Sequence, residues 1–500
     1  MTQELVIGLK PVWLIGVGAL AGLIGIALLF LLLVVIHRRS AATMWELLRE
    51  KLIFPVLIVA VLLGLFSIGM TISDSLGSRF FDRKKDTLLS LFRLASVGAQ
   101  DIEVDIQPDA LSQKILLDIP SGELKTISLT SSEPLTVGIN IPPIEASIQN
   151  LERFEVLPGE PFKWTRSLDA TGPLRKSVRA LYVANDGNVA ATLNIQLVTS
   201  VVVPEARLIL YTACGLFLYA VVYLLLQASF PKVAAVAFTT GKEAVSQPLF
   251  RLTVVLGSFL ILLFVFVPYF TFGDDIKMYK EACLQVIMLL SMFLAIWTAS
   301  VSVADEIEGR TALTVLSKPI GRSQFIVGKF VGIASALALL FLLLGTLFVL
   351  CISYKVAYDA RESANYYVTW QDSSRAMALA VPGLVLAFME SIVLASISVA
   401  ISTRLSILAN LIICMGIYVV GHLLPLFVQS SVGEFAIVQF MGQLCATVLP
   451  VLEHFNIYGA IAAGEQVPLS YIAWVGGYSL VYITIAMLLA LALFDDRDLA

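Results

Sequence analysis

Charged side chains are scarce in this sequence of 500 residues. Asp, Glu, Lys and Arg make up only 14% of it, whereas 58% is hydrophobic and the mean hydropathy is +0.89. A chain of this composition cannot be dissolved in water throughout, so a purely soluble enzyme is excluded. The formal net charge of −4 provides no basic field that would attract nucleic acid. We therefore expect a chain that lies largely in membrane lipid and has no nucleic-acid partner.

Cysteine and histidine are also rare, with five and three residues. All five cysteines lie in apolar surroundings and none belongs to a CxxC pair, so they predict neither a disulfide framework nor a metal site. His422 and His454 lack a carboxylate pair or cysteine at ligand spacing, and we interpret them as satisfied polar groups. The sequence contains no recognisable Ser/His/Asp triad, set of metal ligands or set of redox residues. The sequence predicts no catalytic residue and no metal or cofactor in this chain.

Long apolar runs, in contrast, occur in nine places. A membrane-spanning helix needs about 20 mainly apolar residues. Windows that meet this test begin near residues 12, 52, 206, 252, 282, 325, 377, 405 and 470. The run from Val12 to Ile36 is too long for a signal peptide, and its basic cluster follows it instead of preceding it. We predict nine spanning helices, the first uncleaved and with its N-terminus outside.

The charges of the loops support this orientation. With the N-terminus outside, the cytoplasmic segments hold 13 Lys and Arg residues and the short outer segments hold six, as the positive-inside rule expects. The run at 432–449 contains Glu434 and two glutamines and ends at Pro450. We predict a re-entrant or interfacial helix within the outer segment 432–459, because a tenth span would place the C-terminus outside.

The stretch from 74 to 203 differs from the rest of the chain, because it holds 29 of the 70 charged residues. It opens with a predicted amphipathic helix and continues with short alternating runs between Pro and Gly residues, including 114–119, 124–129, 135–141 and 178–183. Such alternation indicates strands. Asn185, Asp186 and Gly187 predict a hairpin turn before the run 190–203. We predict an extracytoplasmic β-sandwich-like domain, immunoglobulin-like by analogy, with a structural or partner-binding role.

The segment Asp305 to Lys329 lies between the fifth and sixth predicted spans. It begins with three carboxylates, continues through a short apolar run, breaks at Pro319 and ends where the next span begins. Lys329 is placed to extend its amine to the membrane interface. Such a segment can lie along the membrane surface and present a short helix to a partner.

These residues resemble the first intracellular loop of permease subunits of type 2 ATP-binding-cassette (ABC) exporters. The matching positions are Glu306, Glu308, Gly309, Thr311, Leu316, Pro319, Arg322, Gly328 and Lys329. The resemblance extends from about Thr240 to Leu499, including an amphipathic interface segment at 241–251 and a terminal Phe494, Arg497, Asp498 and Leu499. It is strongest to the branch associated with multi-copper enzyme maturation, gliding motility and polysaccharide export. The first 235 residues depart from the minimal family.

This resemblance implies a coupling loop that rests in a groove of a separate cytoplasmic ABC ATPase. Its candidate residues are those nine together with Asp305 and Arg310. The resemblance also implies a homodimer or a heterodimer with a second permease, surrounding membrane lipid, and a multi-pass location in a bacterial inner membrane. ATP and Mg belong to the partner, because Gly321 and Gly328 are too far apart for a phosphate-binding loop and Phe330 replaces its Ser or Thr. We therefore expect no ATP hydrolysis by this chain.

Glu390 lies in the middle of the seventh predicted span, where an ionisable group is costly unless it faces protein or water. Two interpretations are open. Glu390 is either a polar point on a transport path, including a proton-sensitive gate, or a packing residue that forms a helix-helix hydrogen bond to Asn410 or Thr298. The glycines at 257, 332, 345 and 416 are expected to permit close helix approach.

Together these features predict an α-helical polytopic membrane protein with four parts. Residues 1–73 form two spans, 74–203 the β domain, 204–235 the third span and linker, and 236–500 a six-helix permease core with a coupling loop at 305–322. The leading function is ATP-driven export of an unidentified substrate. The alternatives are an ABC-coupled mechanotransmission protein that transports nothing, and a membrane anchor whose outer domain binds an envelope partner.

Overall fold

The computed structural model describes residues 2–36, 38–73, 84–93, 97–108, 112–140, 153–166, 174, 177–201, 203–267, 269, 275–305, 320–362, 368–429, 440, 442, 444–445 and 447–495. The chain divides into two compact units. The helical unit comprises Met1–Phe80 and Tyr211–Ala500, and the β unit comprises Phe81–Leu210. Each unit has a hydrophobic core of its own.

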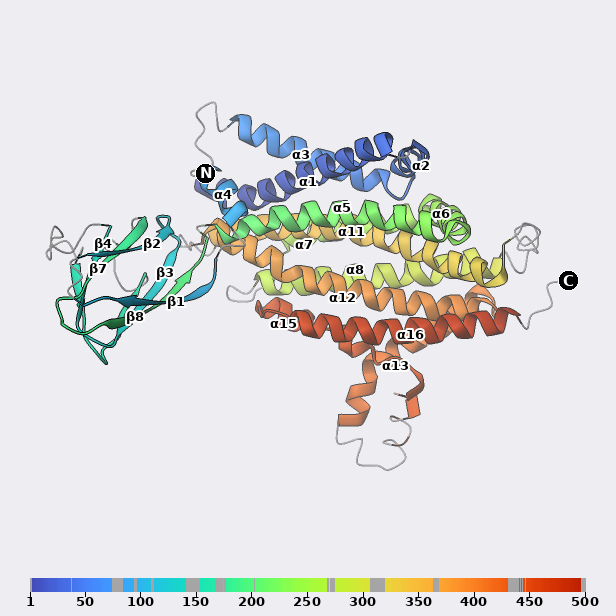
Figure 1. Cartoon of the computed structure of the whole chain (residues 1–500). Helices are drawn as coiled ribbons and strands as arrows, with labels where there is room; N and C mark the ends of the chain where they lie inside the picture. Colours follow the sequence, from blue (N-terminus) through green and yellow to red (C-terminus); the bar gives the residue numbers. More distant parts are fainter. Residues whose placement is uncertain are drawn as a thin grey trace. The chain divides into compact units, whose positions relative to one another are not determined.

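The helical unit is built from long apolar helices (Figure 1). Its N-terminal part contains α1 (Thr2–Ile36), α2 (Arg38–Leu48), α3 (Phe54–Ser73) and α5 (Arg207–Ser229). The remainder contains α6 (Pro231–Ser246), α7 (Pro248–Phe266), α8 (Asp275–Ala299), the π-helix η5 (Ser300–Asp305), α11 (Arg322–Glu362), α12 (Trp370–Ser402), α13 (Ile407–Gln429), the 3₁₀-helix η7 (Leu452–Phe455), α15 (Tyr458–Ala463) and α16 (Leu469–Asp495).

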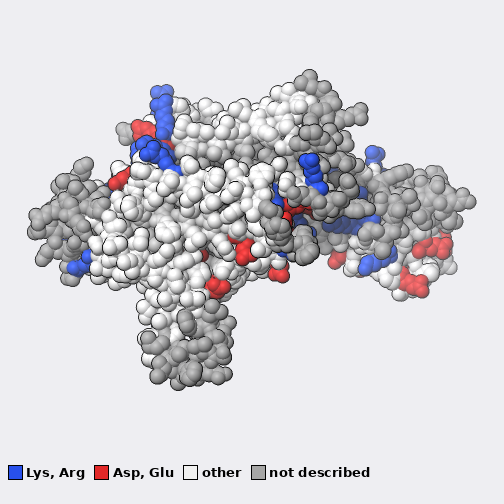
Figure 2. All heavy atoms as spheres, turned by 180° about the vertical axis from the view of Figure 1, so that it is seen from behind, with Lys and Arg blue, Asp and Glu red and all other residues white. Residues whose placement is uncertain are grey.

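Nine helices in the described part of the chain are long and apolar enough to cross a membrane. They begin close to the nine positions expected from hydropathy, because a run long enough to cross the bilayer must satisfy its backbone groups within a helix. On the face shown in Figure 2, the helical unit presents a broad surface without described charged side chains. The predicted polytopic helical fold with an inserted β domain is confirmed.

The core of the helical unit is formed mainly by α8, α11 and α12, whose spans are the most deeply buried. Between α8 and α12, the hydroxyls of Ser291 and Ser391 lie 2.7 Å apart within the buried layer. The helix α13 leaves the main layer of helices at a steep angle (Figure 1). The helix α12 begins with a capping box, in which Asp372 accepts a hydrogen bond from the backbone N–H of Thr369.

The helices α1 and α3 form an antiparallel hairpin. We call this hairpin, α2 and α5 together the N-terminal extension. The hydroxyl of Ser67 donates to the carbonyl of Trp13, and Trp13 donates from its indole to Thr71. The extension contacts the core through α1, where the hydroxyl of Ser353 on α11 donates to the carbonyl of Gly8. Three extra spans are thus packed onto the six that follow.

The β unit is a sandwich of two four-stranded antiparallel sheets around one core. One sheet has the order β1 (Ala99–Ile106), β8 (Ala191–Thr199), β3 (Leu124–Ser131), β6 (Phe162–Thr165). The other has the order β2 (Gln113–Ile119), β7 (Val178–Ala184), β4 (Leu135–Ile139), β5 (Arg153–Val156). The unit also contains α4 (Lys84–Arg93) and the 3₁₀-helix η4 (Pro204–Ala206). Alternate residues of each strand enter the core, as the sequence alternation predicts.

Two sequence predictions are wrong in detail. The predicted hairpin at 185–187 does not form, because β7 and β8 belong to different sheets and their connection crosses the sandwich. Asn185 stabilises this crossing by donating to the carbonyls of Gln107 and Val189. The amphipathic segment expected at 241–251 is instead α6, which begins at Pro231 and ends at Ser246. A turn signal specifies a reversal of the chain, but not whether the next strand pairs with the previous one.

Candidate functional site

The structure describes only the borders of the predicted coupling loop. Asp305 ends the π-helix η5, whereas Glu306, Glu308, Gly309, Arg310, Thr311, Leu316 and Pro319 lie outside the described residues. Arg322, Gly328 and Lys329 belong to the beginning of α11. The site is therefore built here from the elements that begin and end this segment. We use the term base for one end of the helical unit, which is formed by residues 49–53, α6, the start of α11 and the end of α16. The sequence predicts that this end faces the cytoplasm.

A tight joint between α6 and α11 dominates the base. A side chain at Gly328 would come within 2.6 Å of Cβ of Val236, and one at Gly332 within 2.6 Å of the carbonyl of Ala237 and of Cβ of Thr240. The two helices can approach this closely because these positions have no Cβ. The joint holds α6 against the helix that continues the loop, so displacement of either helix is transmitted to the other.

The start of α11 is also tied to the end of α16. Arg322 donates to the carbonyl of Asp495 over 2.8 Å, and its guanidinium lies 3.8 Å from the Asp495 carboxylate. The rings of Phe325 and Phe494 stack with their centroids 5.8 Å apart, and both are fully buried. Lys329 does not extend to the membrane interface as expected. It is only 4% exposed, and its amine lies 5.6 Å from the Phe325 ring centroid.

On the other side of the loop, the π-helix η5 is held by a buried polar cluster. The side-chain amide of Asn410 on α13 lies within donor distance of Ser300, at 2.7 Å, and of Ser398 and Ser402, at 2.7 and 2.8 Å. Cys414 donates to the amide oxygen of Asn410. A π-helical turn is uncommon and recurs at functional positions. The cluster therefore joins α12 and α13 to η5, the element that ends where the loop begins.

The N-terminal extension also reaches the base, which the sequence analysis did not anticipate. Glu50 forms an ion pair of 2.7 Å with Lys242 on α6, and the amine of Lys51 donates to Ser246 over 3.0 Å. Leu52 packs over Gly241 and accepts, through its carbonyl, a hydrogen bond from Tyr219. Glu50 and Lys242 carry opposite charges, but nothing in the sequence indicated that they would meet.

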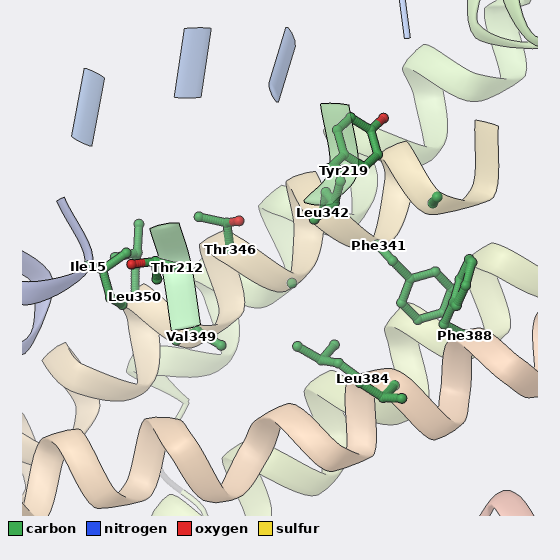
Figure 3. Close-up of a pocket in the computed structure, with 13 residues that line it drawn as sticks. Ile15, Thr212, Tyr219, Phe341, Leu342, Thr346, Val349, Leu350, Leu384 and Phe388 are labelled. Carbon is green, nitrogen blue, oxygen red and sulfur yellow. The ribbon is translucent and has the colours of Figure 1, made fainter. Parts of the chain in front are cut away.

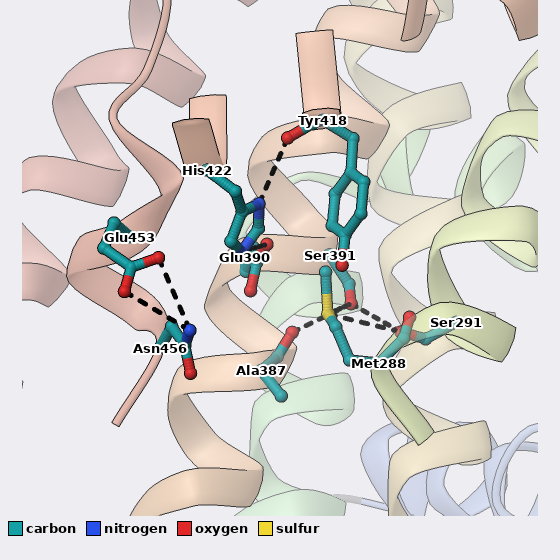
Figure 4. A network of polar contacts seen from close by, with 9 residues as sticks. All are labelled: Met288, Ser291, Ala387, Glu390, Ser391, Tyr418, His422, Glu453 and Asn456. Carbon is teal, nitrogen blue, oxygen red and sulfur yellow. Dashed lines mark hydrogen bonds and ion pairs between the residues drawn. The ribbon is translucent and has the colours of Figure 1, made fainter. Parts of the chain in front are cut away.

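A second polar site lies inside the helical unit around Glu390 (Figure 4). The carboxylate is fully buried, and Oε1 lies 3.4 Å from Nε2 of His422 on α13. Nδ1 of His422 lies 3.1 Å from the carbonyl of Tyr418, so this nitrogen is the one that donates. Nε2 and Oε1 form an ion pair when the imidazole is protonated, and neither carboxylate oxygen has a hydrogen-bond partner among the described residues.

Both partners expected for Glu390 are wrong. Asn410 bonds to the serines near η5, and Thr298 donates to carbonyls of its own helix. His422 was considered from sequence only as a weak metal ligand, because nothing there indicated its distance from Glu390. In the part of the chain that the structure describes, no three His, Cys, Asp or Glu side chains converge as a metal site. His454 contacts the Tyr478 ring, and its carbonyl accepts from Tyr471.

Comparison with known families agrees with this arrangement. Residues 259–499 match the family model described as ABC-2 family transporter protein. This segment is an ABC-2 type permease domain. It contains the loop, η5, the Asn410 cluster and the Glu390 site, whereas the N-terminal extension, α6 and the β unit precede it. No curated protein is similar enough to the chain to be matched with it.

The permease domain and the extension together line an open apolar cavity of about 430 Å³ (Figure 3). Ile15 of α1 and Thr212 and Tyr219 of α5 form one side. The other side comes from α11 and α12, including Phe341, Leu342, Thr346, Leu384 and Phe388. Gly345 lies in the cavity wall, where an added Cβ would come within 3.1 Å of Leu384. An apolar cavity of this volume suits a hydrophobic ligand.

Proposed function

We propose that this chain, a permease component of an ABC transporter, couples ATP hydrolysis by a separate cytoplasmic ATPase to outward movement of a hydrophobic or lipid-linked substrate. The protein works as a dimer of permeases in a bacterial inner membrane, and ATP and Mg are bound by the ATPase. The segment 305–322 is the element that contacts the ATPase.

The observation that carries this proposal is the construction of the base. The two ends of the segment 306–319 are continuous with η5 and α11, and each is fixed to other helices by close contacts. A displacement of the segment is therefore transmitted to α6, α12, α13 and α16, because closely packed helices do not move independently. A loop that served only to connect two spans would need no such joint.

The substrate class is supported by the apolar cavity between α1, α5, α11 and α12. Its lining has few polar atoms, and the helices that form it are candidate membrane spans. A ligand can therefore enter from the lipid without losing hydration. The Glu390–His422 pair places polar side chains in the seventh and eighth candidate spans, and we assign it a role in gating.

The coupling proposal is tested by co-purification. The tagged protein in mild detergent is expected to retain an ABC ATPase, and a variant with Ala at Glu306, Glu308 and Arg310 is expected to lose it. The matched control carries Ala at the basic residue Arg251 of α7, which lies outside the segment, and should retain the ATPase. Recovery of equal amounts of ATPase with the triple variant would contradict the proposal.

A second function has one specific observation in its favour. The β unit is a two-sheet sandwich with its own core, larger than a connection between two spans requires. In this alternative, ATP hydrolysis changes how the β unit contacts an envelope partner, and no substrate crosses the membrane. The two functions are distinguished by measuring export after the sandwich strands are removed. ATPase-dependent export of a substrate by the shortened protein excludes the alternative.

A further inference from the structure

A different cavity, of about 660 Å³, lies between the N-terminal extension and the start of α6. Leu29 and Leu33 of α1 and Phe217, Val221 and Leu225 of α5 form its apolar walls. Behind them, Met44 and Ala220 belong to a buried cluster against which Leu29 and Leu33 pack, so the cavity is preformed. Since α1 and α5 are candidate membrane spans, the apolar walls are accessible to lipid acyl chains.

One end of this cavity is polar. Ser40 and Thr43 of α2 and Gln227 of α5 line it. The Oε1 atom of Gln227 is shielded and has no hydrogen-bond partner among the described residues. Shielded amide oxygens almost always accept a hydrogen bond, so this atom can accept one from a water or from a molecule in the cavity.

A helix begins beside this cavity. Pro231, which lines the cavity, is the first residue of α6, and the N-cap residue Phe230 provides no side-chain acceptor for the N–H groups of the first turn. The first turn of a helix carries partial positive charge and favours an anion. The exposed side chains of Arg38 and Lys232 belong to the segments that border it, two residues before Ser40 and one residue after Pro231.

We propose that this cavity binds an anionic membrane phospholipid of the phosphatidylglycerol type. One acyl chain lies along the walls formed by α1 and α5. The phosphate lies at the start of α6 near Arg38 and Lys232, and a hydroxyl of the glycerol headgroup donates to Oε1 of Gln227. The lipid connects the extension to α6, which is held against α11. This site is independent of the proposed transport function, because lipid binding requires neither an ATPase nor a substrate.

Native mass spectrometry of the purified full-length protein tests the site with phosphatidylglycerol, phosphatidic acid and phosphatidylcholine of identical acyl chains. Wild-type protein should bind phosphatidylglycerol tightest. Arg38→Ala combined with Lys232→Ala should weaken phosphatidylglycerol binding by roughly tenfold or more and change phosphatidylcholine binding little. Gln227→Leu should remove the preference for phosphatidylglycerol over phosphatidic acid, which lacks the headgroup hydroxyls.

The matched control is Arg251→Ala, which removes an exposed basic side chain at the start of α7 and should leave phosphatidylglycerol binding unchanged. Val221→Trp, which fills the cavity, should abolish binding of all three lipids at this site. If that variant does not fold, the exposed Arg38 and Lys232 substitutions still decide the question. Equal binding of phosphatidylglycerol and phosphatidylcholine to wild type, or phosphatidylglycerol binding unaffected by the double substitution, would overturn the proposal.

Discussion

The pair Glu390 and His422 shows how strongly one residue can depend on another in the membrane interior. The Glu390 carboxyl group is fully buried, and Nε2 of His422, 3.4 Å away, is the polar group that faces it from α13. Loss of the histidine leaves the buried Glu390 side chain without this polar partner. Neither residue can therefore be understood from its own helix alone.

A double-mutant cycle tests this dependence. His422→Leu is expected to lower the free energy of unfolding by about 3 kcal/mol, because it leaves the Glu390 carboxylate unpaired in the buried layer. Glu390→Gln together with His422→Leu should recover most of this loss, since the amide carries no charge. Thermal unfolding in detergent provides the measurement. Equal destabilisation by the single and double variants would show that the pair does not interact.

Glu123 in the β unit provides a pH-dependent prediction. Its side chain is buried, and burial raises the pKa of its carboxyl, although Arg93, 3.5 Å away, acts in the opposite direction. A folded-state pKa above the unfolded value means that stability is highest below the unfolded pKa and falls as the pH rises through the folded pKa. Glu123→Gln should therefore match wild type near pH 4 and protect the β3 amides better at pH 7. Hydrogen exchange of both proteins at the same pH measures this difference, and greater protection of wild type at pH 7 would contradict it.

At the scale of elements, the joint between α6 and α11 is the most constrained part of the base. The two helices meet at positions without a Cβ, and the ion pair of Lys242 with Glu50 adds the extension to the same contact. The base is therefore a three-part assembly in which α6 lies between the extension and the permease domain.

Gly332→Leu tests this joint. The new side chain would collide with Ala237 and Thr240, so the free energy of unfolding should fall by about 3 kcal/mol, and ATPase activity of the purified complex should respond less to substrate. Gly416→Leu is the matched control, because nothing lies within 4 Å of an added Cβ there. Similar effects of both substitutions would argue against a specific role for the joint.

The same comparison corrects one sequence expectation. Gly257, Gly332 and Gly345 lie at close helix contacts, as predicted, but Gly416 faces open space. A glycine in an apolar run indicates that close approach is possible, whereas the position of the neighbouring helix decides whether it occurs.

At the scale of the whole molecule, the division into two units predicts that the helical unit folds independently of the β unit. The helical unit has its own core, and none of the described residues of the sandwich belongs to that core. Replacing residues 97–201 by a short polar linker should leave the helical unit folded and able to retain its ATPase. Size-exclusion chromatography and co-purification provide the measurement. Aggregation of the shortened protein would show that the sandwich is required to assemble the helices.

The sequence by itself determined the class of the protein, the positions of the nine candidate spans in the described part of the chain and most strands of the sandwich. The physical reason is that these features depend on local properties: the length of an apolar run against the bilayer thickness, and the alternation of side chains along a strand. The motif around Gly328 and Lys329 likewise identified the permease domain that the family comparison supports.

Only the tertiary structure decided which distant residues meet. It paired Glu390 with His422, placed β7 and β8 in different sheets, and brought Glu50 and Lys242 together across the base. It also created the two cavities, since each has walls from helices far apart in the sequence. Hydropathy and spacing specify which face of an element is buried, but the partner of that face follows from packing of the whole chain, where many apolar surfaces are chemically equivalent and shape selects among them.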